Sequence, residues 1–333
     1  MTSPSRIVLS RLDRIGDLIL STPAIASVRH SWPDAHVTLV CSGHNAGVVQ
    51  RNVDVDETVV LASGESAWRA GARFRGKVDL AIALAPRAHD FTLIAATRAA
   101  RRIGYTYVRR YAARLSAWLF LTDVAVSEAD PDLCDRDGAY AVRHEVDQIL
   151  SLVSLAGGKP VCRDLVITIS EEDRRAVASV PAGGIAVQLA PRWISDGSTL
   201  ESTLELLRML RRFGVPIVAV YGSDATDLAE RVRIEGVADA VLGGLPFSRW
   251  AAVYEKCAVV VTVDTGATHL ASATCRPTVV LFEHRYFNLN SQEWSPYNVP
   301  SVLLRKPADE RPASLERMRA EIVAAVASLL GAA

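Results

Sequence analysis

Short apolar runs alternate with amphipathic stretches along the whole chain. Runs of β-branched and aliphatic residues predict buried strands, and apolar positions spaced by about 3.6 residues predict the helices between them. In the first half, strands are expected at residues 7–10, 36–41, 58–61 and 78–84, and helices at 18–29, 45–51, 91–101 and 144–156. In the second half, strands are expected at 184–189, 215–221, 240–242, 259–263 and 278–282, and helices at 200–213, 227–235, 248–256, 268–274 and 314–330. This alternation predicts an α/β fold with parallel sheets that are covered on both faces.

The second half of the chain repeats the plan of the first. We therefore expect two nucleotide-binding-like domains, at residues 1–160 and 161–312, that face each other across a ligand-binding cleft. The last stretch, residues 313–333, has amphipathic spacing and predicts a terminal helix that is free to pack back on the first domain.

The first candidate site is the strand-to-helix turn Arg11-Leu-Asp-Arg-Ile-Gly-Asp17. Gly16 permits a tight turn, and the positive end of the helix dipole favours a carboxylate at Asp17. A carboxylate held ionised there suits a general base. The alternative is that Asp17 only satisfies the helix start. Asp13 and Arg14 form a local ion pair in one interpretation, and in another Arg14 binds a negatively charged ligand.

The second candidate site is the turn Val263-Asp-Thr-Gly-Ala-Thr-His269, which also joins a strand to a helix. The backbone N–H groups of Thr265, Gly266 and Ala267 are placed to cradle a phosphate at the helix N-terminus. Asp264 would then face sugar hydroxyls, because a carboxylate beside a pyrophosphate is repelled, and His269 would donate to a phosphate or hydroxyl. The alternative is an ordinary capped helix with a half-buried histidine.

Composition narrows the class of protein. The chain has 333 residues, is 50% hydrophobic and has a formal net charge of +0, which argues against a nucleic-acid-binding surface. No apolar run reaches the length needed to span a bilayer, and residues 1–6 show no signal-peptide pattern, so we expect a cytoplasmic protein. The five cysteines contain no Cys-x-x-Cys pair and are expected to be reduced thiols: Cys41, Cys134, Cys162, Cys257 and Cys275.

Positive charge is concentrated in one part of the first half. Six arginines surround three tyrosines there: Arg98, Arg101, Arg102, Arg109, Arg110 and Arg114. They would receive an acidic acceptor or rest against an anionic membrane surface. The alternative is a solvated helical face with salt bridges to the acidic residues 128–137. His89 follows the strand that ends at Leu84 and is expected to approach the cleft.

At the two turns the chain resembles the bacterial heptosyltransferases, glycosyltransferase family 9. Members of that family share an Arg-x-x-x-Ile-Gly-Asp start and a late Asp-Thr-Gly-x-x-His motif. The likeness runs nearly end to end and includes Arg101-Arg-Ile-Gly104 and Pro277-Thr-Val-Val-Leu-Phe282. The resemblance implies a GT-B fold, in which two Rossmann-like domains face each other across a cleft. The N-terminal domain would then bind the acceptor, and the C-terminal domain the nucleotide sugar.

The same resemblance implies an inverting transfer of a sugar from an ADP-heptose-type donor to a glycan or lipopolysaccharide-core acceptor. Asp17 matches the general base of the family. The donor would be bound by Asp264, Thr265, Gly266, His269, Arg192, Asp224 and Leu245, the last two at the ribose and adenine contacts. The acceptor would be bound by Arg14, Gly16, His89 and Arg109. The implied partners are a nucleotide sugar and a glycan or lipid-linked acidic acceptor, with peripheral contact to the inner membrane as an option and no nucleic acid.

One loop departs from the family pattern. Ala190-Pro-Arg-Trp-Ile-Ser-Asp-Gly-Ser198 lacks the lysine that contacts the donor phosphates in the family, and Asp196 lies nearest its position. Either Arg192 takes over that role or the donor differs. Three alternatives therefore stay open: a non-catalytic nucleotide-sugar-binding protein, a family member with another donor and acceptor, and a nucleotide-sugar epimerase. No metal-ligand cluster lies at a predicted strand end facing the cleft, so no metal or other cofactor is expected to be required, although a loosely bound magnesium ion is compatible with the sequence.

Overall fold

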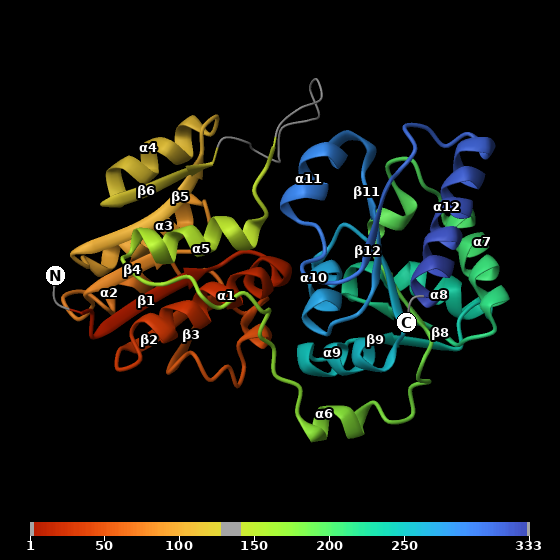
Figure 1. Ribbon diagram of the computed structural model, residues 1–333, viewed down its shortest axis with the longest axis horizontal. Coiled ribbons are helices and arrows are strands. Elements are labelled where there is room, and N and C mark those ends of the chain that lie inside the picture. The colour runs from red at the N-terminus through yellow and green to blue at the C-terminus, as the bar shows by residue number, and fades with distance from the viewer. Residues whose placement is uncertain (1–2, 128–140, 332–333) are drawn as a thin grey trace. The chain divides into compact units, whose positions relative to one another are not determined.

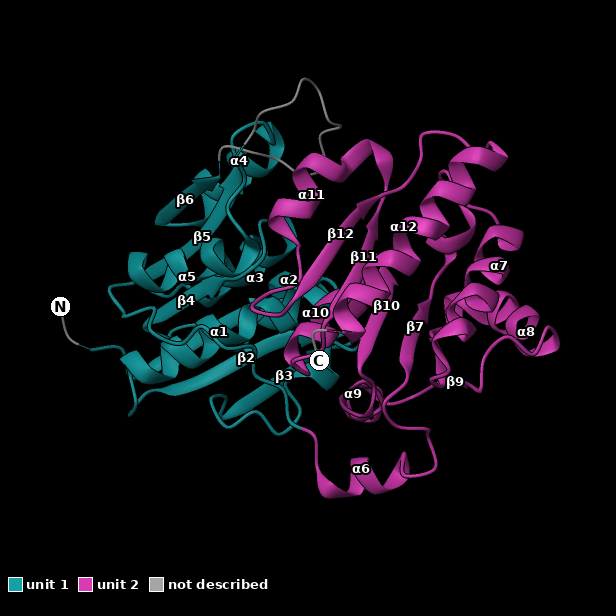
Figure 2. Ribbon diagram, turned by 45° about the vertical axis from the view of Figure 1, so that its right-hand side comes forward, with its two compact units in different colours: residues 1–132, 139–168 teal, residues 133–138, 169–333 magenta. Residues whose placement is uncertain are grey.

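The computed structural model describes residues 3–127 and 141–331, which divide into two compact units coloured separately in Figure 2. Unit 1 extends to Thr168, and unit 2 begins at Ile169. The boundary expected from the sequence, at residue 160, lies eight residues before the one in the structure.

Unit 1 is a six-stranded parallel sheet with helices on both faces (Figure 1). Its strands are β1 (Arg6–Arg11), β2 (His36–Ser42), β3 (Glu57–Leu61), β4 (Leu80–Ala83), β5 (Arg101–Tyr107) and β6 (Asp123–Ser127). Its helices are α1 (Ile15–Ser31), α2 (Ala67–Ala72), α3 (Ala88–Thr97), α4 (Tyr111–Phe120) and α5 (Glu145–Leu155). Helices α1 and α5 pack together, and α2, α3 and α4 form a second packed group around Phe91, Leu93 and Ile94.

Unit 2 has the same plan. Its strands are β7 (Ile185–Leu189), β8 (Ile217–Tyr221), β9 (Ala240–Gly243), β10 (Val259–Val263), β11 (Thr278–Phe282) and β12 (Ser301–Arg305). Its helices are α6 (Glu171–Ala176), α7 (Leu200–Leu210), α8 (Thr226–Ile234), α9 (Phe247–Lys256), α10 (Gly266–Ala273), α11 (Phe287–Glu293) and α12 (Pro312–Leu330). Strands β7, β10 and β11 are buried along their full length, as expected of parallel strands covered on both sides.

Both sheets have the strand order of the doubly wound nucleotide-binding fold. The order is β3-β2-β1-β4-β5-β6 in unit 1 and β12-β11-β10-β7-β8-β9 in unit 2, and every strand pair is parallel. The direction of winding reverses between β1 and β4 and between β7 and β10. Ligands of such sheets bind at the carboxyl ends of the strands beside this reversal.

Helix α1, which carries Asp17, continues through Pro23. A proline lacks the N–H group that would bond to the carbonyl four residues earlier, here that of Ile19. The Thr22 hydroxyl donates to this carbonyl instead, at 2.7 Å. Because Thr22 replaces the lost donor, the helix runs on to Ser31.

Several elements differ from those expected. Residues 45–51, expected to be a helix, contain only the short 3₁₀ turn Ala46–Val48. The arginine-rich stretch holds β5 and α4, and β12 was not predicted. Helix α12 buries Met318, Ile322 and Val326 in the core of unit 2, whereas the sequence analysis considered packing against the first domain. Within the described residues, no helix is both long and apolar enough to cross a membrane. The four described cysteines are free thiols; Cys134 lies outside the described residues.

Candidate functional site

Each residue that the sequence analysis assigned to a site follows the carboxyl end of a strand in its own unit. In unit 1, Arg14, Gly16 and Asp17 follow β1, His89 follows β4 and Arg109 follows β5. In unit 2, Arg192 follows β7, Asp224 follows β8, Leu245 follows β9, and residues 264–269 follow β10. The turns after β1 and β4, and those after β7 and β10, lie at the winding reversals where such folds bind ligands.

In unit 1 the centre of the site is Arg11, the last residue of β1. Its side chain is only 2% exposed and is bound by three carboxylates: Asp13 at 2.8 Å from Nε, Glu145 at 2.9 Å from Nη1 and Asp17 at 3.4 Å from Nη2. It also donates to the Leu84 carbonyl. Burial works against this charge, but the three carboxylates raise the pKa of Arg11 well above its usual value. The guanidinium is therefore a permanent cation that holds the acidic residues around it.

Two further side chains fix this cluster from distant parts of the sequence. The Tyr105 hydroxyl of β5 contacts both carboxylate oxygens of Glu145 at 2.8 Å. The Asn45 side-chain amide donates to the backbone carbonyls of Arg11, at 3.0 Å, and Asp13, at 3.3 Å. The turn between β1 and α1 is thus held by the end of β5, the start of α5 and the loop after β2.

Asp17 is the member of the cluster best placed to react. Burial raises the pKa of its carboxyl, while Arg11 lowers it and Glu145 raises it further. The Asp17 side chain is 15% exposed, whereas those of Asp13 and Glu145 are 6% and 2% exposed. A carboxylate with a raised pKa and an accessible oxygen is a stronger proton acceptor than a free aspartate, which is what a general base requires.

Asp90 lies beneath this cluster, in the first turn of α3, and is fully buried. Burial raises the pKa of its carboxyl to about 7, with Asp13 adding to the rise and Ser10, Arg11 and the Leu12 N–H opposing it. A fourth carboxyl group thus interacts electrostatically with Asp13 and Arg11 of the cluster.

The pH dependence of stability tests the state of Asp90. Because its pKa is raised above the unfolded value of 3.8, the folded protein holds one more proton than the unfolded protein between about pH 4 and pH 7. Asp90 therefore costs stability as the pH rises through this window. We expect the free energy of unfolding of Asp90→Asn, relative to wild type, to rise by about 1.4 kcal/mol per pH unit there.

Urea midpoints at pH 5, 6, 7 and 8 measure this difference, with Asp227→Asn, at an exposed carboxylate of α8, as the control for loss of one carboxylate. The asparagine amide is buried at every pH, so it shifts all four midpoints by the same amount. The readout is therefore the slope of the stability difference against pH. Parallel curves for wild type and Asp90→Asn between pH 5 and pH 7 would show that Asp90 is ionised throughout.

The acceptor-binding candidates lie on the same edge of the unit 1 sheet as Asp17. Arg14, His89 and Arg109 are exposed, and Gly16 is buried in the first turn of α1. Asp13 pairs with Arg11 and, at 3.7 Å, with Arg87, where the sequence analysis considered a pair with Arg14. The acidic residues 128–137, considered as partners for the arginines, lie outside the described residues.

In unit 2 the loop after β7 is fastened to the segment after β12. Lys306 is 1% exposed, and its ammonium group donates to the backbone carbonyls of Arg192 and, at 2.8 Å, Ser195. Burial lowers the pKa of Lys306 to about 8. Gly197 has a φ of +83°, and a Cβ atom there would lie 2.1 Å from the Pro307 carbonyl oxygen. The loop therefore presents Arg192 from a fixed backbone.

Arg192 joins this loop to the turn after β10. Its Nη1 lies 3.1 Å from the Asp264 carboxylate, and its Nε lies 3.2 Å from that of Glu283. Asn290 also donates to Asp264, at 3.3 Å. Burial raises the pKa of Asp264, and Arg192 lowers it. Within the described residues Nη2 of Arg192 makes no hydrogen bond, and the side chain is 35% exposed, so this end of the guanidinium remains able to donate to a ligand.

The turn after β10 places backbone donors beside Arg192. Thr265 precedes the first residue of α10 in an extended conformation, and its side chain does not cap the helix. The N–H groups of Gly266 and Ala267 open the helix, where a phosphate would bind. His269 is only 4% exposed, less than the half-buried histidine that the sequence suggested.

The remaining donor-binding candidates lie on the same edge of the unit 2 sheet. Asp224 is exposed in a 3₁₀ turn after β8, and Leu245 is partly exposed just before α9. A Cβ atom at Gly222 would lie 2.9 Å from the Asp224 carboxylate, so a larger residue there would displace this side chain.

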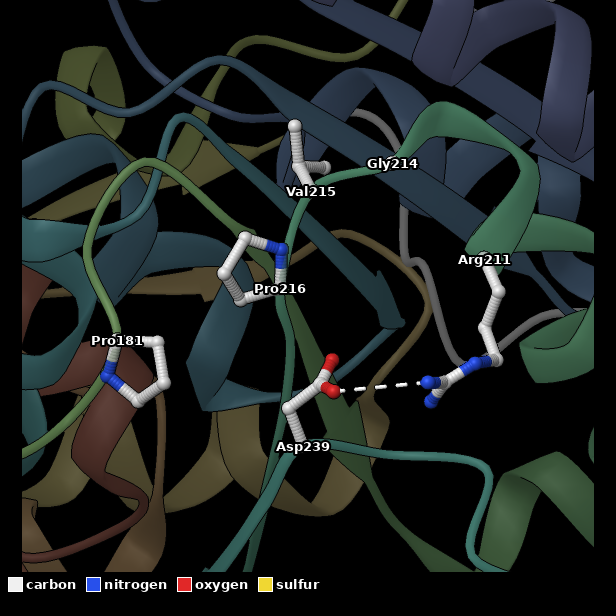
Figure 3. A pocket seen from close by; sticks show the side chains of 6 residues that line it. All are labelled: Pro181, Arg211, Gly214, Val215, Pro216 and Asp239. Carbon is white, nitrogen blue, oxygen red and sulfur yellow. Dashed lines mark ion pairs between the residues drawn. The ribbon is translucent and has the colours of Figure 1, made fainter.

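A pocket of about 420 Å³ lies at the opposite edge of the same sheet. Figure 3 shows its lining, in which Asp239 pairs with Arg211 at 3.6 Å beside Pro181 and Pro216. Asp239 also accepts from the Ile217 N–H at 2.8 Å, so its carboxylate fixes the start of β8. We assign this pocket a structural origin.

Residues 3–127 and 141–331 hold no group of three His, Cys, Asp or Glu that could bind a metal ion.

The sequence pattern does not reveal four further members of these clusters: Glu145, Tyr105, Glu283 and Lys306. Glu145 lies 134 positions from Arg11, and Lys306 lies 111 from Ser195, so no local spacing connects them. The available signal was a cation at or just after the carboxyl end of a strand, as at Arg11 at the end of β1 and Lys306 after β12.

Comparisons with known proteins agree with this architecture. Residues 201–321 match the family model of glycosyltransferase family 9 (heptosyltransferase). No curated protein matches the chain in sequence.

Three solved structures are similar over nearly the whole chain. A family 9 glycosyl transferase from Veillonella parvula has 20% identity and a TM-score of 0.77, covering 99% of this chain and 98% of its own. The E. coli ADP-heptose lps heptosyltransferase II has 16% identity, a TM-score of 0.74 and coverage of 98% on both sides. The E. coli heptosyltransferase WaaC with ADP has 18% identity and a TM-score of 0.70, covering 98% of this chain and 100% of its own. The expected GT-B fold is thereby confirmed.

Proposed function

We propose that the chain, which matches the family 9 glycosyltransferase model over residues 201–321 and has the GT-B fold, transfers a sugar with inversion from a nucleotide-diphosphate donor. The proposed acceptor is a hydroxyl of a glycan or a lipid-linked acidic sugar of the lipopolysaccharide-core type. ADP-heptose is the proposed donor. Proteins of similar fold include an ADP-heptose transferase and a heptosyltransferase bound to ADP, which supports this choice.

The observation that carries the proposal is the state of Asp17. It lies at the winding reversal of unit 1, its carboxyl has a pKa raised by burial, and one of its oxygens pairs with a buried arginine. In the proposed step Asp17 takes the proton of the acceptor hydroxyl as that oxygen attacks the anomeric carbon. The bond from this carbon to the diphosphate breaks on the opposite side, so the configuration inverts and the nucleoside diphosphate leaves.

Unit 2 would stabilise the departing diphosphate. Its negative charge grows in the transition state, so fixed donors aimed at it contribute more there than in the ground state. The N–H groups at the start of α10 and the exposed end of Arg192 are the proposed donors. Asp264 and Glu283 hold the guanidinium in place, and Asp264 is left with less capacity to repel a phosphate because Arg192 offsets its charge. Thr265, Gly266, His269, Asp224 and Leu245 complete the proposed donor site.

Arg192 in this proposal replaces the lysine that the loop lacks, and substitution tests it. We expect Arg192→Met to lower kcat/KM for the donor by about 10²-fold, the effect of removing one donor to a developing anion. Arg192→Lys should be intermediate, because an ammonium group does not reproduce the two contacts with Asp264 and Glu283.

Arg211→Met is the matched control, since it removes an ion-paired arginine from the opposite edge of the same sheet. Initial rates of ADP release over a range of donor concentrations give the comparison. Equal kcat/KM values for Arg192→Met and Arg211→Met would remove Arg192 from the donor site.

The whole proposal is tested by incubating the purified protein with ADP-heptose and a lipopolysaccharide-core acceptor and following ADP and glycan product. We expect acceptor-dependent ADP release, and the same rate with EDTA, because the diphosphate is held by N–H groups and arginine. Binding of ADP-heptose by calorimetry without transfer to any acceptor would identify a non-catalytic sugar-nucleotide binder. Transfer from another nucleotide sugar only would correct the donor.

A further inference from the structure

The outer face of α4 has an unusual distribution of side chains. Tyr111, Leu115, Trp118 and Leu119 lie at the spacing of one helical face and are 77%, 58%, 75% and 59% exposed. The opposite side of the helix, at Ala117, is 1% exposed and packs toward α3 and β5. The helix thus buries a small residue and directs four large apolar residues to the solvent. We call these four residues the α4 face.

Further exposed apolar side chains lie on the segments that flank α4 in the sequence. Helix α4 packs against β5, close to the edge strand β6 of unit 1 (Figures 1 and 2). Val108, Val124 and Val126 are 37%, 36% and 46% exposed. Seven of the thirteen large apolar side chains exposed in the described residues therefore fall within positions 108–126. Single exposed apolar residues are ordinary, but four large ones on one face of a helix mark a surface that binds something.

The charge beside this face is of one sign. Residues 91–122 contain six arginines and neither Asp nor Glu. Two of these arginines are bound within unit 1. Arg101 donates to the carbonyls of Leu155 and Ala156. Arg102 donates to the carbonyls of Phe120 and Ala99. Arg109 and Arg114 are exposed at the start of α4, and Arg110 stacks on the Tyr107 ring at 4.6 Å. The face therefore combines exposed aromatic and aliphatic side chains with exposed arginines at one end.

We propose that the α4 face docks unit 1 on an anionic lipid surface. Trp118, Leu115, Tyr111 and Leu119 would enter the boundary between headgroups and acyl chains, and Arg109, Arg110 and Arg114 would contact lipid phosphates. Tryptophan and tyrosine are enriched at this boundary, and a helix with an apolar face and basic neighbours lies in its plane. Positive charge draws such a helix to anionic lipid.

The position of α4 also fits an acceptor carried by the lipid. The helix begins four residues after β5 ends, at the same edge of the sheet as the turn that carries Asp17. Strands β5 and β1 are separated by one strand, so they lie about 10 Å apart across the sheet. A lipid-linked acceptor reaching the surface beneath α4 would therefore arrive on the side of unit 1 where the proposed base lies.

Cosedimentation of the full chain with vesicles tests the docking without relying on activity. We expect binding to phosphatidylglycerol-containing vesicles and little binding to phosphatidylcholine vesicles, with a marked loss between about 0.05 M and about 0.5 M salt, because charge attraction is screened. Trp118→Ser/Leu119→Ser should lower the partition coefficient at least tenfold. Arg109→Gln/Arg114→Gln should lower it and flatten the salt dependence.

Trp68→Ser is the matched control, because Trp68 is 48% exposed on α2 of the same unit. Because only exposed side chains are changed, we expect each variant to fold, and circular dichroism checks this. Binding of Trp118→Ser/Leu119→Ser equal to that of wild type, or lowered equally by Trp68→Ser, would overturn the proposal. So would a wild-type dimer in sedimentation equilibrium that this double variant converts to a monomer without any vesicle binding, because the α4 face would then join two copies.

Discussion

Replacing Asp17 by asparagine should lower the transfer rate by about 10²- to 10⁴-fold, the range in which a positioned general base contributes. Asparagine keeps the shape of the side chain and a hydrogen bond acceptor toward Arg11, but it cannot take the acceptor proton. Donor binding should stay within about twofold, because unit 2 supplies the proposed donor contacts. Single-turnover rates and calorimetric titration with ADP-heptose measure the two quantities separately.

The matched control is Asp34→Asn, at an exposed carboxylate that precedes β2 on the opposite edge of the same sheet. It should transfer like wild type. The wild-type pH profile gives an independent check, because the base acts only when it is ionised. Activity should fall as the pH decreases through the pKa of Asp17, which burial places above the usual range for aspartate. Full activity of Asp17→Asn would leave Asp17 with the structural role of a helix start.

Replacing Arg11 by methionine should destabilise the folded protein by about 3–5 kcal/mol, the usual effect of removing one partner from a buried ion pair. Methionine fills much of the same space but leaves Asp13, Asp17 and Glu145 without their shared cation. Because these carboxylates are largely buried, their negative charges would repel one another without compensation. Urea midpoints at pH 7 measure the loss.

A second substitution distinguishes lost charge balance from lost packing. Glu145→Gln, added to Arg11→Met, removes one uncompensated charge and keeps a partner for the Tyr105 hydroxyl. We expect the double variant to be more stable than Arg11→Met alone, a coupling that a double-mutant cycle quantifies. A double variant that is no more stable than Arg11→Met, or an Arg11→Met as stable as wild type, would contradict this account of the cluster.

The sequence was sufficient to predict the parallel sheets, because their central strands are uninterrupted apolar runs. Strands β7, β10 and β11 lie close to the expected positions, and the turns after β1 and β10 lie where the motifs placed them. Strand β5 was missed because it begins with two arginines and contains a glycine. The structure accommodates Arg101 there by hydrogen bonds to the carbonyls of Leu155 and Ala156, at the C-terminal end of α5, and no local pattern reveals that partner.

The clusters around Arg11 and Arg192 illustrate the same limit. The motifs named Asp17 and Asp264, and the cations beside them were visible in the sequence. Which carboxylates those cations hold depends on strand order, since Glu145 and Glu283 reach the sites from other elements. Burial then decides the chemistry, because it raises the pKa values of Asp17 and Asp264 and of the unassigned Asp90. None of these shifts follows from the spacing of residues along the chain.

The most direct test of the proposed function is the anomeric configuration of the product. Wild-type protein, ADP-heptose and a lipopolysaccharide-core acceptor are incubated, and the new glycosidic linkage is examined by nuclear magnetic resonance. Displacement assisted by Asp17 predicts a linkage opposite in configuration to that of the donor, and almost none of it with Asp17→Asn. A product that retains the donor configuration, or one formed equally well by Asp17→Asn, would contradict the account.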